Sequence, residues 1–156
     1  MERTLVLLKP DALQRGLLGE ILARFERKGL KVAGLKMMQL EDALLDEHYS
    51  HLSHLPFFGE IKAFMMQTPV VALCLEGVNS VETVRRMCGV TKSWEAEPGT
   101  IRGDFGMSIQ ANLVHASDSL ETAQNEVPRF FGPAELFDYD FLKLPYLYTN
   151  KERSEG

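Results

Sequence analysis

The chain contains little cysteine, no long apolar segment and no run of basic residues. Cys74 and Cys88 are the only cysteines, and their spacing fits neither a disulfide framework nor a CxxC metal site, which favours reduced thiols. The apolar run from Leu5 to Leu8 is too short for a signal-peptide core, and no segment reaches membrane-spanning length. The formal net charge of −5 argues against nucleic acid as a partner. We therefore expect a soluble, cytoplasmic protein without membrane contact.

The glycine patterns of the common nucleotide-binding loops are also missing. Thr91-Lys92-Ser93 is similar to the end of a P-loop, but the glycines which that motif needs are replaced by other residues. No dinucleotide-binding fingerprint is present either. A nucleotide site in this chain would therefore have to use another geometry.

The hydrophobic pattern predicts a single α+β domain over residues 1–156, since 45% hydrophobic content is enough for one core. Short apolar runs predict strands, and periodic or helix-favouring stretches predict helices. The expected strands are 5–8, 30–38, 70–75 and 109–115, and the expected helices are 16–28, 41–54, 58–66, 80–87 and one that opens with a capping box at 118–121. This order suits a ferredoxin-like sandwich, a four-stranded antiparallel sheet with helices on one face.

Three further features qualify this fold. Two strands are apolar on both faces, so extra helices or another subunit must cover the second face. Residues 89–106 form a long loop without periodicity, which is more often functional than accidental. Residues 139–156 are a C-terminal extension that follows no clear period, and 150–156 are expected to be disordered.

His115 ends the last predicted strand and is followed at once by a small, polar turn. This position holds an imidazole at the rim of a sheet, where it can attack phosphorus at neutral pH and release the phosphoryl group again. Glu126 lies eleven residues further on, in the last predicted helix, and could orient the ring through one nitrogen. The alternative is a solvated histidine without a function.

Basic and hydroxyl side chains gather around the long loop. Such a concentration in an acidic protein suits an anionic ligand, because guanidinium groups bind phosphate oxygens and spread the charge of phosphoryl transfer. The residues are Arg85, Arg86, Thr91, Lys92 and Arg102. The alternative is that they pair with the loop's own carboxylates, Glu95, Glu97 and Asp104, on a solvated surface.

His48, His51 and His54 recur at a spacing of three residues. On a straight helix their side chains would fan over roughly 120°, and no cysteine or carboxylate completes a tetrahedral shell, so we expect no metal site in the protein. Tyr49 and Phe57 lie nearby and could stack on a base, although aromatic residues more often fill the core.

Six segments form a set that extends from about residue 3 to about residue 138. They are Leu7-Leu8-Lys9-Pro10-Asp11, Gln14-Arg15-Gly16-Leu17, Gly19-Glu20-Ile21, Pro56-Phe57-Phe58, Pro98-Gly99-Thr100-Ile101-Arg102-Gly103-Asp104-Phe105 and residues 112–119. In this order and spacing they strongly resemble the nucleoside diphosphate kinase family. The resemblance implies a ping-pong transfer of the γ-phosphate from a nucleoside triphosphate to a nucleoside diphosphate.

The resemblance also implies roles for individual residues. His115 would be the nucleophile, Glu126 and Ser117 would anchor and polarise its ring, and Tyr49 would pack beside it. Phe57 would stack on the base, with Ile109 on the other side, which explains tolerance of every base. The positions that match the family's contacts to sugar and phosphates are Lys9, His51, Arg85, Thr91, Arg102 and Asn112.

Two further implications concern cofactor and assembly. Mg²⁺ would arrive with the nucleotide rather than occupy a site made by the protein. The family assembles as hexamers or tetramers of a common dimer, so a homo-oligomer is expected. Leu55, Lys92-Ser93-Trp94 and Ala116 depart from the family pattern without removing a catalytic group.

Two other functions remain open at this point. One is a nucleotide-binding or regulatory protein that has lost catalysis, although such a protein would not need His115 and Glu126. The other is a relay in which His115 passes its phosphoryl group to another protein, which nothing in the sequence requires.

Overall fold

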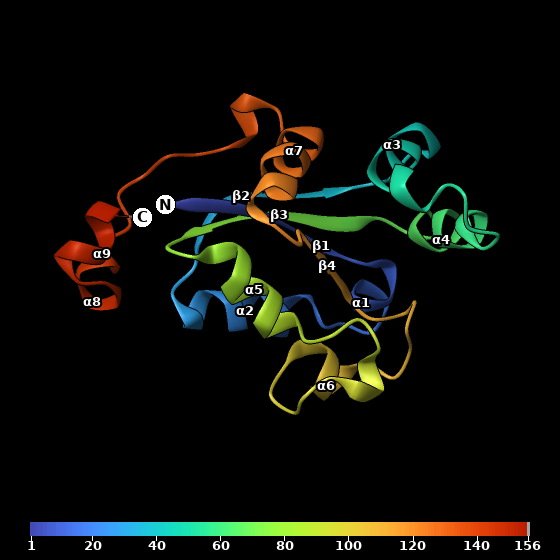
Figure 1. The fold of residues 1–156 in the computed structure, drawn as a ribbon, viewed down its shortest axis with the longest axis horizontal. Helices are drawn as coiled ribbons and strands as arrows, with labels where there is room; N and C mark the ends of the chain where they lie inside the picture. The colour runs from blue at the N-terminus through green and yellow to red at the C-terminus, as the bar shows by residue number, and fades with distance from the viewer. Residues whose placement is uncertain (156) are drawn as a thin grey trace.

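The chain forms one open, four-stranded antiparallel sheet. The computed structural model describes residues 1–155 and orders the strands β2-β3-β1-β4, with each neighbouring pair antiparallel (Figure 1). The strands are β1 Glu2–Leu8, β2 Lys31–Met38, β3 Val70–Gly77 and β4 Val114–Ala116. This topology confirms the predicted ferredoxin-like α+β fold.

Helices connect the strands. The α-helices are α1 Pro10–Gln14, α2 Leu18–Lys28, α3 Asp42–His48, α4 Phe58–Met65, α5 Ser80–Cys88, α6 Ile101–Phe105, α7 Leu120–Phe130, α8 Leu144–Leu147 and α9 Asn150–Glu155. The 3₁₀ turns are Ser50–Leu52, Ser93–Glu95 and Pro133–Glu135. None of the helices within residues 1–155 is both long and apolar enough to cross a membrane.

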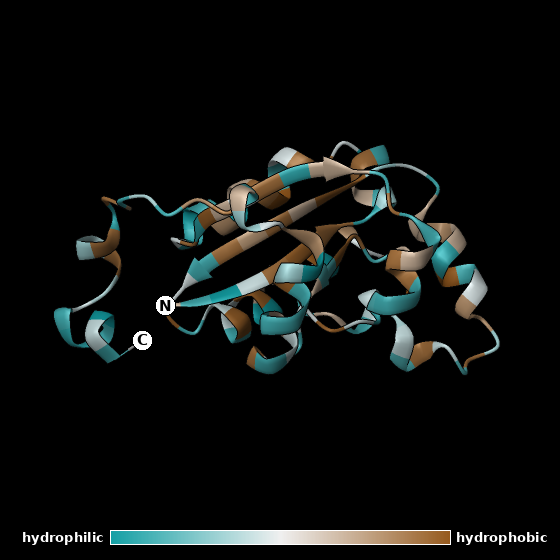
Figure 2. Ribbon diagram, turned by 90° about the horizontal axis from the view of Figure 1, so that it is seen from above, coloured by the Kyte–Doolittle hydropathy of each residue, from teal (hydrophilic) through white to brown (hydrophobic). Residues whose placement is uncertain are grey.

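Helices cover both faces of the sheet, so the second face is covered by extra helices of the chain itself, one of the two alternatives that the sequence left open. Val6 and Leu8 of β1 pack into a core with α2 and α5, whereas Leu5 and Leu7 pack into a second core with α3 and α7. Figures 1 and 2 show the two helical layers and the apolar strands between them. Helices of the same chain therefore bury both faces of β1. Each buried apolar side chain of the strand contributes about 1.5–3 kcal/mol to stability.

The last strand is much shorter than predicted. Residues 109–115 were expected to be extended, but only Val114–Ala116 pair with β1. Leu113 has a φ of 75°, and this left-handed backbone interrupts the ladder. The following helix is capped by Ser119, whose Oγ accepts from the Thr122 backbone N–H, rather than by a box at 118–121.

Other boundaries also differ. The helix expected over 16–28 begins at Leu18, and the short helix α1 precedes it; Gly16, with a φ of 67°, separates the two. The helix expected over 41–54 ends at His48 and continues as a 3₁₀ turn. The long loop 89–106 contains the helix α6.

The C-terminal extension is tied to the edge strand β2. The Phe137 backbone N–H donates to the Ala33 carbonyl (2.8 Å), and the Tyr139 hydroxyl donates to the Val32 carbonyl (2.9 Å). These contacts lie at the irregularity between Val32 and Gly34. The prediction of disorder over 150–156 was wrong for α9, and Gly156 lies outside the described residues.

Candidate active site

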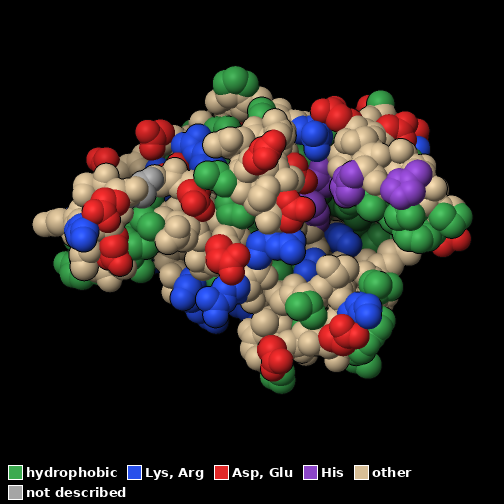
Figure 3. Space-filling model, viewed as in Figure 1, with side chains coloured by type: hydrophobic (Ala, Val, Ile, Leu, Met, Phe, Trp, Pro, Cys, Tyr) green, Lys and Arg blue, Asp and Glu red, His purple; other side chains and the backbone are tan. Residues whose placement is uncertain are grey.

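A cavity of about 640 Å³ opens between α4 and the loop 89–112, beside the end of β4. Figure 3 shows histidine, lysine and arginine side chains gathered around this hollow. The cavity brings together nearly all of the residues singled out from the sequence. They are Lys9, Tyr49, His51, Phe57, Arg85, Thr91, Arg102, Ile109, Asn112, His115 and Glu126.

His115 is fixed by the pairing of β4 with β1 and by a carboxylate from α7. It lies opposite Leu7 in the sheet, and its Nε2 is 2.8 Å from Oε2 of Glu126. A carboxylate accepts hydrogen bonds, so Nε2 carries the proton and Nδ1 keeps its lone pair. The imidazole side chain is 21% exposed and lines the cavity, so Nδ1 has the lone pair that a nucleophile at this place requires.

Glu126 stays ionised although it is almost fully buried. Burial alone would raise the pKa of its carboxyl group. The hydrogen bond from His115, the electrostatic interaction with that imidazole and the Ser117 hydroxyl outweigh burial and lower the pKa to about 2. Ser117 itself does not line the cavity; its Oγ accepts from the Leu5 backbone N–H, behind the site.

Two aromatic rings from α3 and its end lie behind His115. The ring of His48 meets that of His115 edge to face at 4.6 Å, and the ring of Tyr49 lies at 6.4 Å. Burial, with a contribution from the charge of Glu126, raises the pKa of the Tyr49 phenol. From the sequence, His48 was considered as a metal ligand and as an aromatic residue able to stack on a base, and its place behind His115 was missed.

Lys9 forms the floor of the cavity near Asn112. Its Nζ donates to Oδ1 of Asn112 (2.7 Å) and to the Gln110 carbonyl (3.3 Å). Burial and the charge of Arg102 lower the pKa of Lys9 to about 8, although Asp11 opposes them. The ammonium group is therefore charged at neutral pH and close to losing its charge.

Arg102 has a role that the sequence did not reveal. Its guanidinium donates to the carbonyls of Gly89 (2.6 Å), Val114 (2.6 Å) and Asn112 (3.2 Å), so it also holds the loop against β4. Arg85 makes no ion pair within residues 1–155, which leaves its charge for an anion. The alternative of surface pairing applies to other loop charges, because Lys92 pairs with Glu95 and Asp104 with Arg24.

A strained residue next to the site is held by Asp11. The left-handed Leu113 is fully buried, and its N–H donates to Oδ2 of Asp11 (3.0 Å). A non-glycine residue with positive φ costs of the order of 1–3 kcal/mol and persists only where its surroundings enforce it. Asp11 thus fixes the backbone between Asn112 and His115. The Lys9-Pro10-Asp11 segment was noted in the sequence, but this contact was not.

Part of the cavity lining is apolar. Phe57 and Ile109 line it from opposite elements and remain 47% and 51% exposed. Exposed aromatic and aliphatic side chains at the mouth of a cavity suit a flat ring between them.

Within residues 1–155, the side chains close enough to share a metal ion are His48, His115 and Glu126, whose ligand atoms lie within 4.8 Å of one another. Two nitrogens and one oxygen suit zinc better than Mg²⁺, which prefers oxygen. Nη1 of Arg129 lies 3.3 Å from Nδ1 of His48. The positive charge of this guanidinium disfavours a metal cation at the same place. The spacing of His48, His51 and His54 does not produce a shared site.

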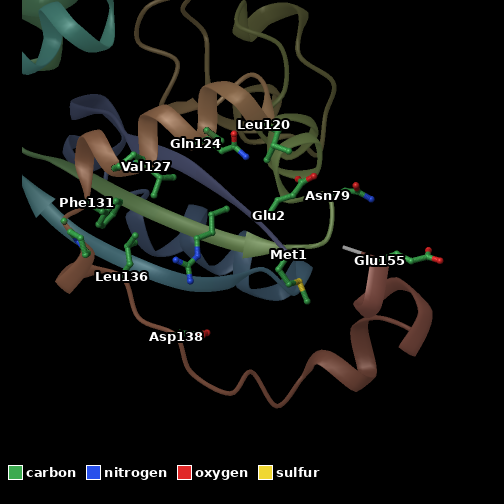
Figure 4. A pocket seen from close by; sticks show the side chains of 15 residues that line it. Met1, Glu2, Asn79, Leu120, Gln124, Val127, Phe131, Leu136, Asp138 and Glu155 are labelled. Carbon is green, nitrogen blue, oxygen red and sulfur yellow. The ribbon is translucent and has the colours of Figure 1, made fainter.

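A second cavity of about 930 Å³ lies at the opposite end of β1, under α7 and the C-terminal extension (Figure 4). Its wall includes Val127, Phe131 and Leu136, and its acidic residues are Glu2, Asp138 and Glu155. It holds no nucleophile beside an orienting base, so its size does not make it the reactive site.

An imidazole with one nitrogen held by a carboxylate and the other facing a cavity rich in lysine and arginine defines a phosphotransferase site. A family model described as nucleoside diphosphate kinase matches residues 2–136. The nucleoside diphosphate kinase of Parabacteroides distasonis is 55% identical over 97% of this chain and 99% of its own length. That of Gloeobacter violaceus is 52% identical over 95% and 99%, respectively.

The solved structure of a Halobacterium salinarum nucleoside diphosphate kinase in complex with CDP has a TM-score of 0.93, with 41% identity and coverage of 95% of this chain and 99% of that one. The chain belongs to the nucleoside diphosphate kinase family. It is a transferase that moves the terminal phosphate between nucleotides through a phosphohistidine.

Proposed function

We propose that His115 carries the phosphohistidine and that the 640 Å³ cavity binds both nucleotides in turn. Nδ1 attacks the γ-phosphorus of a nucleoside triphosphate, the bond to the β-phosphate oxygen breaks, and the nucleoside diphosphate leaves. A terminal oxygen of a second diphosphate then attacks the phosphorus, and the P–N bond breaks. The observation that carries this proposal is the 2.8 Å contact between Nε2 of His115 and Glu126, which leaves Nδ1 free.

The positive side chains in the cavity hold the phosphates. The charge on the transferring group sits on its non-bridging oxygens, where Lys9, Arg85 and Arg102 can compensate it. Thr91, Asn112 and His51 add polar groups to the lining of the cavity. Tyr49 packs against the nucleophile and Ser117 against its carboxylate partner.

We infer Mg²⁺ as the cofactor. It binds the nucleotide phosphates and neutralises their charge. The carboxylates that line the cavity are Glu60, Asp118 and Glu126, and Glu126 is engaged by His115. So few free carboxylates fit an ion that is bound mainly by the nucleotide phosphates. Asp118 is exposed and can reach a hydrated ion, whereas a cage made by the protein would need more oxygen ligands.

Phe57 and Ile109 enclose the base. The relative from Halobacterium salinarum is described in complex with CDP, which supports a nucleoside diphosphate in the corresponding place here. Stacking does not depend on the identity of the base, so we propose that every common base is accepted.

The assembly we propose is a homo-oligomer, a hexamer or a tetramer built from a common dimer. The uncovered half of edge strand β2 supports it, because Leu35 and Met37 are 52% and 61% exposed there. We also propose a single domain and a cytoplasmic location, consistent with Cys74 and Cys88 being free thiols in the core.

Phosphorylation by labelled ATP and Mg²⁺, followed by a chase with GDP, tests the function. We expect wild type to acquire an acid-labile label that leaves as GTP, and His115→Ala to acquire none. His54→Ala is the matched control, since His54 is exposed and does not line the cavity. ATP binding without label would contradict the proposal and indicate a binding protein. A label that passes to another protein and ignores GDP would indicate a relay.

A further inference from the structure

His48 is buried directly behind the proposed nucleophile. Its side chain has no exposed surface, and its ring meets His115 edge to face at 4.6 Å. On its other sides it packs against Tyr49 at 4.7 Å and Phe130 at 5.0 Å. It does not line the cavity, so it cannot touch the nucleotide there. A ring so enclosed is rigid and limits the rotation of the ring that it touches.

The contacts of Nδ1 define the tautomer of His48. Nη1 of Arg129 lies 3.3 Å from this nitrogen, and a guanidinium can only donate. We infer that Nδ1 accepts this hydrogen bond, which leaves the proton of the neutral ring on the buried Nε2. Nε of Arg129 is held in turn by Oε1 of Glu47 (3.0 Å).

This tautomer matters for Glu126. Oε2 of Glu126 lies 3.3 Å from Nδ1 of His48 and 2.8 Å from Nε2 of His115. If Nδ1 of His48 carried a proton, the two histidines would compete for the same oxygen. Because Arg129 occupies the lone pair of Nδ1, Oε2 accepts from His115 and not from His48.

His48 is also kept uncharged. Burial, together with electrostatic interactions with His115, Arg129 and His51, lowers the pKa of His48 to about 3. The carboxylate of Glu126 has the opposite, smaller effect. The neighbouring Tyr49 is neutral, because burial raises the pKa of its phenol. An imidazolium at this place would neutralise the carboxylate that polarises His115.

We propose that His48, oriented by Arg129, is a positioning residue for the phosphoryl transfer: its edge fixes the plane of His115, and its unprotonated Nδ1 reserves Glu126 for that ring. The inference rests on the proposed role of His115 as nucleophile. It adds two residues, His48 and Arg129, that act through their neighbours and do not touch the substrate.

Two substitutions of His48 separate the two functions of its ring. His48→Phe keeps an aromatic edge and removes the nitrogen, whereas His48→Asn keeps an acceptor near the place of Nδ1 and removes the ring. We expect both to slow the single-turnover phosphorylation by on the order of tenfold, the scale of groups that orient a reacting partner. KM should change by less than about twofold, since ground-state binding is untouched.

Arg129→Met tests the orientation. Without Arg129, Nδ1 of His48 can take a proton and bind Glu126, so the phosphorylation rate should fall increasingly as the pH is lowered from 8 to about 5.5. The double variant His48→Phe/Arg129→Met should lose the part of this acid limb that exceeds the wild-type limb, because His48 is no longer present to compete for Glu126. Arg27→Met is the matched control, an exposed arginine of α2 that should keep the wild-type profile.

Long-range ¹H–¹⁵N spectra of the resting protein give a readout that does not need turnover. Wild type should show His115 protonated at Nε2 and His48 unprotonated at Nδ1, and Arg129→Met should shift both assignments. Wild-type phosphorylation rates and an unchanged His115 signal in both His48 variants would overturn the inference and leave His48 a packing residue. Failure of wild type to become phosphorylated, with the expected spectra intact, would contradict the proposed function instead.

Discussion

The charge of Glu126 is what distinguishes His115 from a histidine that is merely held in place. An amide at the same position could still accept from Nε2 but could not stabilise the positive charge that the ring gains during attack. We expect Glu126→Gln to keep nucleotide binding and to slow phosphorylation by roughly 10²-fold or more. Rapid-quench measurement with labelled ATP checks this, and a rate close to wild type would contradict the role given to the carboxylate.

Lys9 predicts an alkaline limit of activity. Its pKa is lowered to about 8, so its ammonium loses its proton as the pH rises through that value. Because kcat/KM reports groups of the free enzyme, we expect kcat/KM to fall above about pH 8. Arginine stays charged at this pH, so Lys9→Arg should remove the limb whatever its absolute activity. A limb that persists in Lys9→Arg would assign the titration to another group.

At this scale, the sequence pointed to the groups that we propose act directly and missed those that we propose act through others. His115, Glu126 and Lys9 are polar residues in motifs, and the structure places them in one cavity. His48 and Arg129 are in contact only because α3 packs across α7, and their spacing in the sequence does not predict that contact. The three carbonyls bound by Arg102 likewise depend on the folded loop.

Among the larger elements, the turn that precedes β4 depends on Asp11 in α1. Asp11→Ala removes the acceptor that holds the strained N–H of Leu113, and a hydrogen bond to a charged group contributes about 1.5–3 kcal/mol. We expect a lower free energy of unfolding by about this amount, together with slower phosphorylation as His115 loses its fixed backbone. Asp11→Asn keeps an oxygen acceptor and serves as the control. Denaturant unfolding and rapid-quench kinetics of the two variants provide the comparison.

The boundaries predicted least well are those set by single backbone conformations. The pattern of 109–115 is apolar enough for a strand, yet the left-handed Leu113 shortens β4 to three residues. The apolar pattern located both central strands because each is a continuous apolar run that is buried on both faces. It did not locate α6 in the long loop, where five residues form a helix without an apolar period.

For the whole molecule, the buried groups around His115 predict sensitivity to acid. The folded pKa of His48, about 3, is below its unfolded value of 6.5, so the unfolded state binds the proton first and stability falls from about pH 6.5 downward. Glu126 acts in the same direction between its unfolded value of 4.5 and its folded value of about 2. Each group contributes a slope of up to about 1.4 kcal/mol per pH unit.

Urea unfolding at several pH values measures this slope. His48→Phe should unfold with a smaller loss of stability between pH 6.5 and 4.5 than wild type, because it lacks the proton uptake of the unfolded histidine. An identical slope in both proteins would show that His48 does not control acid stability.

The uncovered half of β2 predicts where copies of the chain meet. The extension binds the first half through Ala33 and Val32, but Leu35 and Met37 remain exposed beyond it. Both face the same side as Val71 and Leu73 of β3, so a second copy would enlarge an existing apolar layer.

Leu35→Lys/Met37→Lys places charge there, and we expect the mass measured by light scattering to fall at least twofold while the circular dichroism spectrum is unchanged. Tyr146→Lys, at an exposed site in the extension, should keep the wild-type mass. A fall in mass in Tyr146→Lys and not in the edge variant would place the contact on the extension, because only a buried site is sensitive to an added charge.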